Sequence, residues 1–307
     1  MPEGERKEAI MEQAAIRPLK RRAKWNRTEF WMLLPSVIVL AAITIFPFFF
    51  MIYASFMDYR LDMDHPRFAG LENWQNTLTD ETFWQSWGRT VVYAGGGLIL
   101  QLLLGTGIAL LLYHIPKFRN LFSTLVMLPV FVAPIVTGLL WRFLLDPTYG
   151  FYHWIVRQLG FDVQILGDPN FAMLAVIFMD VWEWTPLVTL IVLAGLQTVP
   201  EEPLEAADVD GANAWQKIFL VMLPMIRRMI VVALLIRSMD ILRYVDTIVI
   251  TTEGGPADAT KTIGYYLMQV AFRFQDIGSA AAVGLTMLVV STLMGRFFIK
   301  VLKAEEA

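Results

Sequence analysis

The sequence predicts an all-α integral membrane protein with about six transmembrane helices. Hydrophobic residues make up 56% and charged residues 17% of the 307 residues, and the mean hydropathy is +0.53. Soluble domains carry roughly 25% charged residues, so this balance is typical of a polytopic membrane protein. Apolar runs close to the roughly 20 residues that cross a bilayer give the expected spans: 30–56, 91–113, 121–145, 171–196, 229–250 and 277–299.

Several classes of function are excluded by residue types that are absent or rare. No cysteine occurs, which excludes disulfides, thiolate metal sites and cysteine nucleophiles. The three histidines lie far apart, each beside an expected membrane end. We therefore expect no metal site and no catalytic residues. A net charge of −3 gives no support for a nucleic-acid partner.

The expected transmembrane domain covers residues 30–300, with a polar tail on either side. Residues 1–29 carry a basic cluster just before the first apolar run, and the apolar segment of a signal peptide is not found there. The basic cluster is expected to set the orientation of the chain in the membrane. It is also expected to contact anionic membrane lipid. We expect a cytosolic N-terminal tail at 1–29 and a cytosolic C-terminal tail at 301–307.

The distribution of lysine and arginine predicts which loops face the cytosol. With the N-terminus inside, the cytosolic segments hold most of these residues. The outer segments then hold far fewer, among them Arg60, Arg67, Arg157, Lys261 and Arg273. Both termini and the loop at 201–224 are therefore expected in the cytosol.

Proline and glycine residues inside the spans predict irregular and closely packed helices. Pro129 and Pro134 lie in the third span and Pro186 in the fourth, and each removes a backbone donor, so we expect kinks. Kinked helices either line a solute pathway or reflect packing irregularity. The run at 95–97 gives the second span a small-residue face for tight helix contact, and it lacks the Gly-Lys-Ser/Thr ending of a phosphate loop.

A polar segment between two apolar runs has the pattern of a docking element. It reads EEPLEAADVDGANAWQKIFLVMLP, from Glu201 to Pro224. A helix is expected over Glu202–Asp210, with small alanines that let another surface come close. Gly211 is expected to end it in a conformation with φ > 0, and a second helix follows to Pro224.

This segment resembles the EAA loop of binding-protein-dependent ABC importer permeases. The shared order is Glu-Ala-Ala, three residues, Gly, nine residues, Val, one residue, Leu-Pro, with Val221 where the family usually has Ile. Asp210-Gly211-Ala212 is similar to the carbohydrate branch, the maltose and glycerol-3-phosphate type of permease. The 68–74 stretch and the Thr-x-Gly-Gly-Pro motif ending at Pro256 also resemble that branch, so the likeness covers about residues 30–300.

The resemblance implies the type I permease fold of ABC importers in the bacterial inner membrane. It implies import of a sugar or sugar derivative, driven by ATP hydrolysis on separate subunits. This chain is therefore expected not to be an enzyme. It is expected to bind no cofactor itself, because ATP and magnesium are bound by the ATPase subunits. The implied partners are a second homologous permease subunit, two ATPase subunits and an extracytoplasmic solute-binding protein. The residues implied to couple to the ATPase are Glu205, Ala206, Ala207, Asp210, Gly211, Ala212, Leu223 and Pro224.

Charged and aromatic residues inside the fourth and fifth spans are candidates for contact with the solute. Charges at the centre of a span cost roughly 2.5–3.5 kcal/mol each, so they are expected to face partners or water. Aromatic rings beside carboxylates suit sugars, because rings pack on C–H faces while carboxylates accept hydroxyl hydrogen bonds. The candidates for the solute pathway are Asp180, Trp182, Glu183, Trp184, Tyr244 and Asp246. Pairing of Arg237 with Asp240 that merely holds helices together is the alternative.

The sequence leaves other functions open. Arginines at 89, 142, 237 and 243 allow an anionic sugar derivative, a polyol or glycerol phosphate as the solute. An ion-coupled secondary transporter could use Asp180 and Glu183 as a proton relay, but such proteins often show repeated halves and the EAA-like loop has no role there. An intramembrane enzyme would need a catalytic motif such as H-E-x-x-H or G-x-S-x-G, and neither occurs. Copurification of an ATPase subunit separates these hypotheses.

Overall fold

The computed structural model describes residues 27–63, 65–160 and 163–304. Most of the N-terminal tail expected at 1–29 and the end of the C-terminal tail lie outside these residues. The chain divides into two compact units, Met1–Phe50 and Met51–Ala307. The described part of the first unit belongs to the helix α2 (Arg27–Ser55), and its side chains from Phe30 to Phe50 are almost all exposed.

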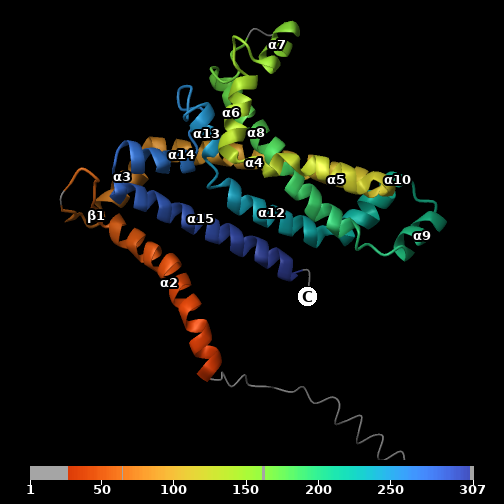
Figure 1. The fold of residues 1–307 in the computed structure, drawn as a ribbon, viewed down its shortest axis with the longest axis horizontal. Helices are drawn as coiled ribbons and strands as arrows, with labels where there is room; N and C mark the ends of the chain where they lie inside the picture. Colours follow the sequence, from red (N-terminus) through yellow and green to blue (C-terminus); the bar gives the residue numbers. More distant parts are fainter. Residues whose placement is uncertain (1–26, 64, 161–162, 305–307) are drawn as a thin grey trace, which may run out of the picture. The chain divides into compact units, whose positions relative to one another are not determined.

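Helices dominate the described residues, and several are long and apolar enough to cross a membrane. Four of these are single helices, α2, α4 (Glu81–Tyr113), α8 (Pro169–Leu196) and α15 (Ile277–Ala304), and two bent pairs raise the number to as many as six. This agrees with the six spans predicted from the apolar runs. Their arrangement from Met51 onward is shown in Figure 1.

Short elements connect these helices. At one end of the bundle these short elements are β1 (Met57–Asp58), β2 (Arg67–Phe68), α3 (Glu72–Thr79), α14 (Ile263–Met268) and the π-helix η4 (Gln269–Arg273). At the opposite end of the bundle lie α9 (Glu202–Val209) and α10 (Ala214–Gln216) (Figure 1). The helix α10 continues through the π-helix η3 (Lys217–Met222) into α11 (Leu223–Met225). The remaining short elements are η1 (Pro116–Phe118), α7 (Phe151–Gln158) and α13 (Asp246–Thr251).

The third predicted span is two helices at nearly a right angle. The first half consists of α5 (Arg119–Met127) and the 3₁₀ turn η2 (Leu128–Phe131), and the second is α6 (Pro134–Leu144), bent from it by 92°. Ala133 is extended, with ψ 137°, as expected for a residue that precedes a proline. The kink predicted at Pro129 and Pro134 is therefore confirmed.

At Pro186, where a kink was predicted, the helix is not interrupted. The helix α8 runs from Pro169 to Leu196 without interruption and contains Pro186 in its interior. Two thirds of its most apolar window (67%) is buried against other helices. Such neighbours allow a membrane helix to continue through a proline, because they support the freed backbone groups.

The fifth predicted span, 229–250, is wrong at its C-terminal end. The helix α12 covers Arg227–Ile241, the chain then leaves the helix, and α13 begins at Asp246. The helix ends next to Asp240 and Arg243. These two charged side chains bond to each other and interrupt the apolar pattern expected of a span. At its other end α12 is bent by 66° from the helical stretch 214–225.

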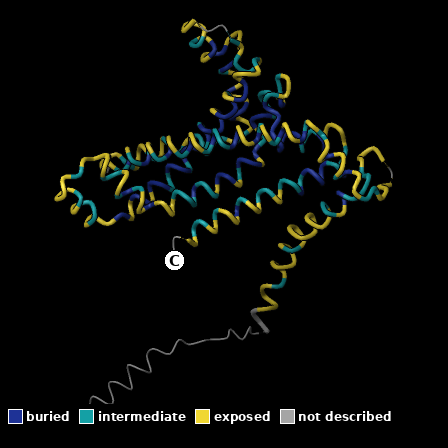
Figure 2. The backbone as a smooth tube through the Cα atoms, turned by 180° about the vertical axis from the view of Figure 1, so that it is seen from behind, coloured by how far each residue is buried: buried dark blue, intermediate teal, exposed yellow. Residues whose placement is uncertain are grey.

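Close packing of α4 against α8 forms the centre of the second unit. A Cβ atom on Gly105 would lie 2.9 Å from Cβ of Val188, and one on Gly97 would lie 2.8 Å from Cδ1 of Ile241. Small residues are therefore required where α4 meets its neighbours. The small-residue face predicted at 95–97 is in contact at Gly96 and Gly97, whereas a Cβ atom on Gly95 would meet nothing within 4 Å. Buried positions lie mainly on the inside of the second unit (Figure 2).

Candidate functional site

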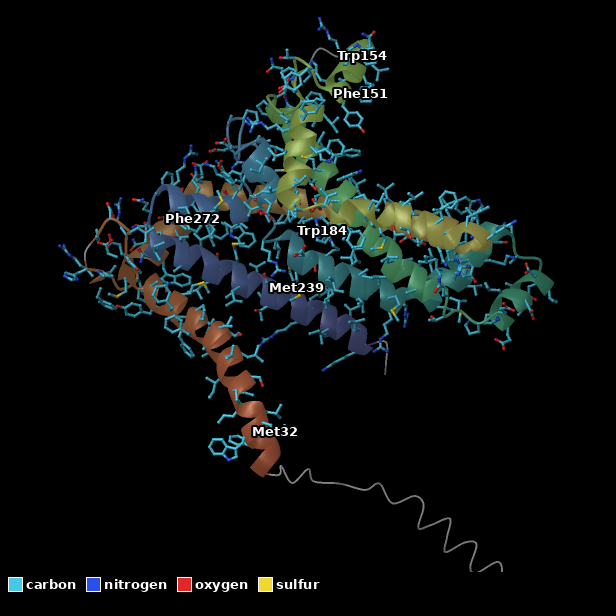
Figure 3. The ribbon with its side chains drawn as sticks, viewed as in Figure 1. Met32, Phe151, Trp154, Trp184, Met239 and Phe272 are labelled. Atoms are coloured by element: carbon cyan, nitrogen blue, oxygen red, sulfur yellow. The ribbon has the colours of Figure 1, made fainter. Side chains whose placement is uncertain are left out.

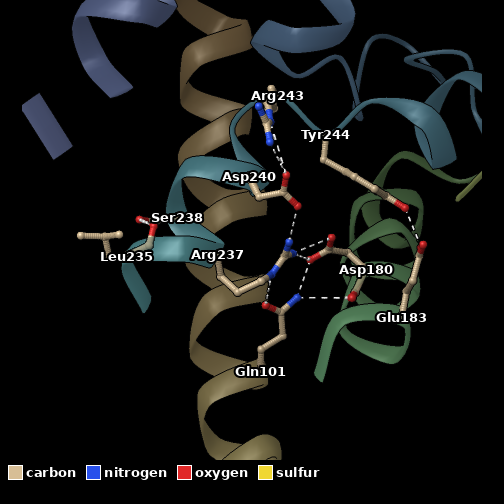
Figure 4. Close-up of polar contacts among 9 residues, drawn as sticks. All are labelled: Gln101, Asp180, Glu183, Leu235, Arg237, Ser238, Asp240, Arg243 and Tyr244. Atoms are coloured by element: carbon tan, nitrogen blue, oxygen red, sulfur yellow. Dashed lines mark hydrogen bonds and ion pairs between the residues drawn. The ribbon is translucent and has the colours of Figure 1, made fainter. Parts of the chain in front are cut away.

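A fully buried arginine joins three helices in the middle of the bundle. Arg237 of α12 donates through Nη2 to both carboxylate oxygens of Asp180 on α8, at 3.0 and 3.1 Å. Its Nε donates to Oε1 of Gln101 on α4 at 2.9 Å, and Gln101 donates in turn to Asp180 at 2.6 Å. All three side chains have no solvent exposure, so the buried charges are paired and bonded (Figure 4).

The network continues from Arg237 toward a cavity through Asp240. Nη1 of Arg237 donates to Oδ2 of Asp240 at 2.8 Å, while Oδ1 of the same carboxylate accepts from Nη2 of Arg243 at 3.0 Å. Exposure rises along this chain, from 0% for the Arg237 side chain to 28% for Asp240 and 77% for Arg243. The predicted pairing of Arg237 with Asp240 is present, and Asp240 bridges two guanidinium groups.

The cavity beside Asp240 has a volume of about 690 Å³ and lies between α8, α12 and α15. Its polar lining includes Arg237, Asp240 and Arg243, and apolar side chains supply most of the remainder. Trp184 and Met239, both labelled in Figure 3, also line it. The guanidinium carbon of Arg237 lies 4.9 Å from the centroid of the Trp184 ring, which fixes both groups by a cation–π contact.

Glu183 is placed behind this cavity and does not line it. Its side chain is 1% exposed, and Oε2 accepts a hydrogen bond from the hydroxyl of Tyr244 at 2.6 Å. The non-helical segment after α12 brings Tyr244 to this position, so the early end of that helix serves to pair a buried carboxyl. Tyr244 in turn packs edge-on against Trp184, with ring centroids 6.4 Å apart.

The two tryptophans beside Glu183 face different surroundings, as the helical spacing predicts. Trp182 packs edge-on against Trp141 of α6, with ring centroids 5.8 Å apart, on the other side of α8 from the cavity. Asp246 is exposed and begins α13, outside the residues that line the cavity. Of the six candidates for the solute pathway, Trp184 lines the cavity, and Asp180 reaches it through Arg237.

Gln101 belongs to the network but was missing from the sequence-based candidates. A signal was available, because Gln101 is an amide in the middle of the apolar run 98–104, and polar side chains within spans bond across helices. Its partners, however, are 79 and 136 residues away along the chain. No local spacing identifies such partners.

The 201–224 loop has the predicted helix–glycine–helix form. The helix α9 covers Glu202–Val209, Asp210 caps it, and Gly211 has φ 76°. The amide of Ala212 donates to the carbonyl of Ala207 at 2.9 Å, and that of Gly211 to Asp208 at 3.1 Å. This pair of bonds is a Schellman motif, which requires a left-handed residue at Gly211.

The two helices of the loop are held together and anchored to the bundle. Lys217 bonds to Asp208 at 2.6 Å, and Asn213 and Gln216 form a capping box at the start of the second helix. Leu204 and Ile218 pack with Leu196 at the end of α8 in one apolar cluster. The loop is therefore attached to the ends of the bundle helices that it joins.

The residues implied to couple to the ATPase form an exposed surface on this anchored loop. Exposed positions are Glu205, Ala206, Asp210, Gly211 and Pro224, and half-buried positions are Ala207, Ala212 and Leu223. Within the loop, the small side chains at 206 and 207 leave the backbone of α9 open to close approach.

A bundle of membrane-length helices, with a cavity lined by paired charges and an exposed, anchored loop, is the architecture of a polytopic membrane permease. Residues 90–302 match the family model described as the inner membrane component of binding-protein-dependent transport systems. The chain belongs to this family, and the resemblance inferred from the EAA-like loop is confirmed. It is therefore a multi-pass protein of the inner membrane and a permease of the ABC importer type.

Curated relatives are similar over most of their length. The trehalose/maltose transport system permease protein MalF of Thermococcus litoralis is 32% identical over 84% of this chain and 87% of its own. The sulfoquinovosyl glycerol transport system permease protein SmoG of Agrobacterium fabrum is 30% identical, covering 90% of each chain. The sn-glycerol-3-phosphate permease protein UgpA of the same organism is also 30% identical, over 86% of this chain and 93% of its own.

Solved structures confirm the fold. A chain of a bacterial ABC transporter that imports the acidic polysaccharide alginate superposes with a TM-score of 0.77, covering 90% of this chain and 94% of that one at 23% identity. A second structure of a bacterial alginate transporter, in complex with a pentasaccharide-bound periplasmic protein, gives 0.76. The predicted ABC importer permease fold is therefore correct.

Proposed function

We propose that this chain is the permease subunit of a bacterial ABC importer for an uncharged sugar. The observation that carries the solute class is the cavity of about 690 Å³, whose lining includes both Trp184 and Asp240. A ring that packs on a sugar's C–H face and a carboxylate that accepts hydroxyl hydrogen bonds are the groups that sugar binding uses. The relatives named for trehalose and maltose support this class.

Charge balance at the cavity favours an uncharged solute. Arg237 is paired with Asp180 and Asp240, and Arg243 is paired with Asp240. The two arginines and two aspartates of the network therefore sum to zero charge. An anionic sugar would have to compete with Asp240 for the guanidinium of Arg243.

A second candidate, an anionic sugar derivative, follows from the exposure of Arg243. Its side chain is 77% exposed, and the guanidinium can bind phosphate or sulfonate oxygens in addition to Asp240. Relatives named for sn-glycerol 3-phosphate and sulfoquinovosyl glycerol support this candidate.

Transport by cells that produce the complete importer separates the two candidates. Uptake of trehalose, maltose, glycerol 3-phosphate and sulfoquinovosyl glycerol is measured with the unaltered chain and with Arg243→Gln. For an uncharged solute we expect little change on substitution. For an anion we expect a loss of about tenfold or more, since a charged hydrogen bond contributes about 1.5–3 kcal/mol. Uptake of an anion but not of trehalose or maltose contradicts the first candidate. Uptake of an anion that is unaffected by Arg243→Gln contradicts the role of Arg243 in binding it.

We further propose that the assembly contains a second homologous permease subunit, two ATPase subunits that bind ATP and magnesium, and an extracytoplasmic binding protein. The residues that couple to the ATPase are those of the 201–224 loop, with α9 seated in a cleft of the ATPase. The exposure of Glu205 and Ala206 and the anchoring of the loop to the bundle support this role. An ion-coupled transporter gives no function to such a loop.

Charge reversal at Glu205 tests the docking of α9. Glu205 is exposed, so Glu205→Lys is expected to leave membrane insertion unchanged while reducing copurification of the ATPase. Glu202→Lys, in the first turn of the same helix, is the matched control, because it carries the same charge change outside the Glu-Ala-Ala motif. Equal ATPase copurification by the unaltered chain and by Glu205→Lys contradicts this assignment.

A further inference from the structure

The second helix of the coupling loop carries an exposed aromatic face. Three large apolar side chains form this face: Trp215, Phe219 and Leu220, which are 70%, 57% and 71% exposed. The rings of Trp215 and Phe219 stack, with centroids 5.9 Å apart and planes 17° apart. The i→i+5 bonding of η3 places both Phe219 and Leu220 about one turn beyond Trp215.

The opposite face of the same helix is already used for packing. Met222 is 3% exposed and belongs to the apolar cluster that includes Leu112 of α4 and Val192 of α8, and Ile218 packs against this cluster. The helix is therefore fixed in rotation by the bundle, and the aromatic face points outward. Stacked rings and a leucine held in this way form an apolar surface that needs a cover.

The geometry of the chain points to the membrane surface as that cover. The helical stretch 214–225 is bent by 66° from α12, which is part of a membrane-spanning segment. Transmembrane helices tilt by about 20° on average, so a helix bent this far lies steeply inclined to the bilayer normal. Met225 and Met229, on either side of the bend, are also exposed apolar side chains, at 46% and 39%.

The charges around this helix fit the same position. Arg227 and Arg228 follow the bend directly, and basic side chains next to a cytosolic end of a span are attracted to anionic headgroups of the inner leaflet. Lys217 is turned to Asp208 of α9 and so marks the polar side of the helix. An apolar aromatic face, a polar face and adjoining basic residues are the features of a helix that lies in the interface.

We propose that the face formed by Trp215, Phe219 and Leu220 is embedded at the boundary between headgroups and acyl chains of the inner leaflet. The coupling loop is then tethered to lipid on one side and to the bundle on the other. Movement of α9 is transmitted to α12 through a helix that cannot swing freely into the cytosol.

The absence of cysteine from the sequence makes a direct test possible. Single variants Phe219→Cys and Leu220→Cys carry a nitroxide label in the complete importer, ATPase subunits included, in lipid nanodiscs. Leu103→Cys, at a 65% exposed position in the middle of α4, is the lipid reference. Asn170→Cys, at an exposed position in the first turn of α8, is the aqueous reference.

Accessibility of the labels to oxygen, which concentrates in lipid, and to a water-soluble nickel chelate is then compared. We expect the oxygen-to-nickel ratio at 219 and 220 to be several-fold above that at 170 and to approach that at 103. A ratio as low as that at 170 overturns the proposal, because the face is then in water. Protection from both reagents also overturns it, because the face is then covered by a protein subunit.

Discussion

Arg237 shows how a charge is accommodated inside this membrane protein. Its guanidinium bonds to Asp180, Asp240 and Gln101, and its carbon lies over the Trp184 ring. A buried ion pair contributes little net stability, but removal of one partner costs about 3–5 kcal/mol, because it leaves a charge unpaired. The network therefore fixes the register of α4, α8 and α12 against one another.

The role of Glu183 can be tested by single substitutions of Glu183 and of Tyr244, its hydrogen-bond partner. Glu183→Gln keeps an oxygen that accepts from the Tyr244 hydroxyl, so we expect assembly of the complex and transport per complex to stay near those of the unaltered chain. Tyr244→Phe removes the donor and leaves a buried carboxyl unsatisfied, at a cost of about 1–3 kcal/mol. The measurements are the yield of assembled complex and the uptake per complex.

A direct role of Glu183 in solute contact gives the opposite pattern. In that case Glu183→Gln lowers uptake per complex while the yield is unchanged. This pattern would show that the solute reaches past Trp184 to the layer behind the cavity.

At the scale of elements, the turn of the 201–224 loop is closed on both sides by specific backbone motifs. The Schellman bonds at Ala212 and Gly211 end α9, and the capping box at Asn213 starts the next helix within two residues. Lys217 and Asp208 tie the two helices together. A turn this short and this well bonded passes a displacement of α9 on to the second helix.

The turn at Gly211 gives a prediction in which backbone strain is separated from crowding. A Cβ atom there would meet nothing within 4 Å, so any effect of a side chain comes from φ 76°, which costs roughly 1–2 kcal/mol for most residues. Gly211→Val is expected to displace the second helix and to reduce transport per ATP hydrolysed, whereas Gly211→Asn is better tolerated in the left-handed region. The ratio of transport to hydrolysis in proteoliposomes is the measurement.

Equal ratios for Gly211→Val and the unaltered chain would show that coupling does not depend on this turn. A loss that is as large for Gly211→Asn as for Gly211→Val would point to a need for glycine itself, for example close approach of the ATPase.

At the scale of the whole molecule, the sequence predicted the elements better than their contacts. Apolar runs set the spans because each must match the bilayer, and Pro129 and Pro134 predicted the bend of the third span because proline and its preceding residue restrict the backbone. The end of α12 at Ile241 could not be read in this way, since apolar residues recur as far as Ile250 on both sides of Arg243 and Asp246. It depends on where Tyr244 meets Glu183.

The partners of the buried charges were the least predictable part. The bond of Arg237 to Asp180 joins residues 57 positions apart, and Gln101 enters from a third helix. By contrast, the pair Arg237–Asp240 is three residues apart on one helix, and the sequence predicted it. Long-range pairs of this kind are set by the packing of α4 on α8, which depends on glycines whose contacts no local pattern reveals.

The orientation of the chain in the membrane is the last prediction. The elements α3 and α14 lie at one end of the bundle and α9 at the other (Figure 1), and the excess of basic residues predicts that the α9 end is cytosolic. Since the chain has no cysteine, Arg157→Cys in α7 and Asp208→Cys in α9 can each be labelled alone in intact cells with a membrane-impermeant maleimide. We expect labelling at 157 before lysis and labelling at 208 only after the membrane is opened. The reverse pattern would place the EAA loop outside, where no cytosolic ATPase can reach it, and the proposed coupling would be lost with it.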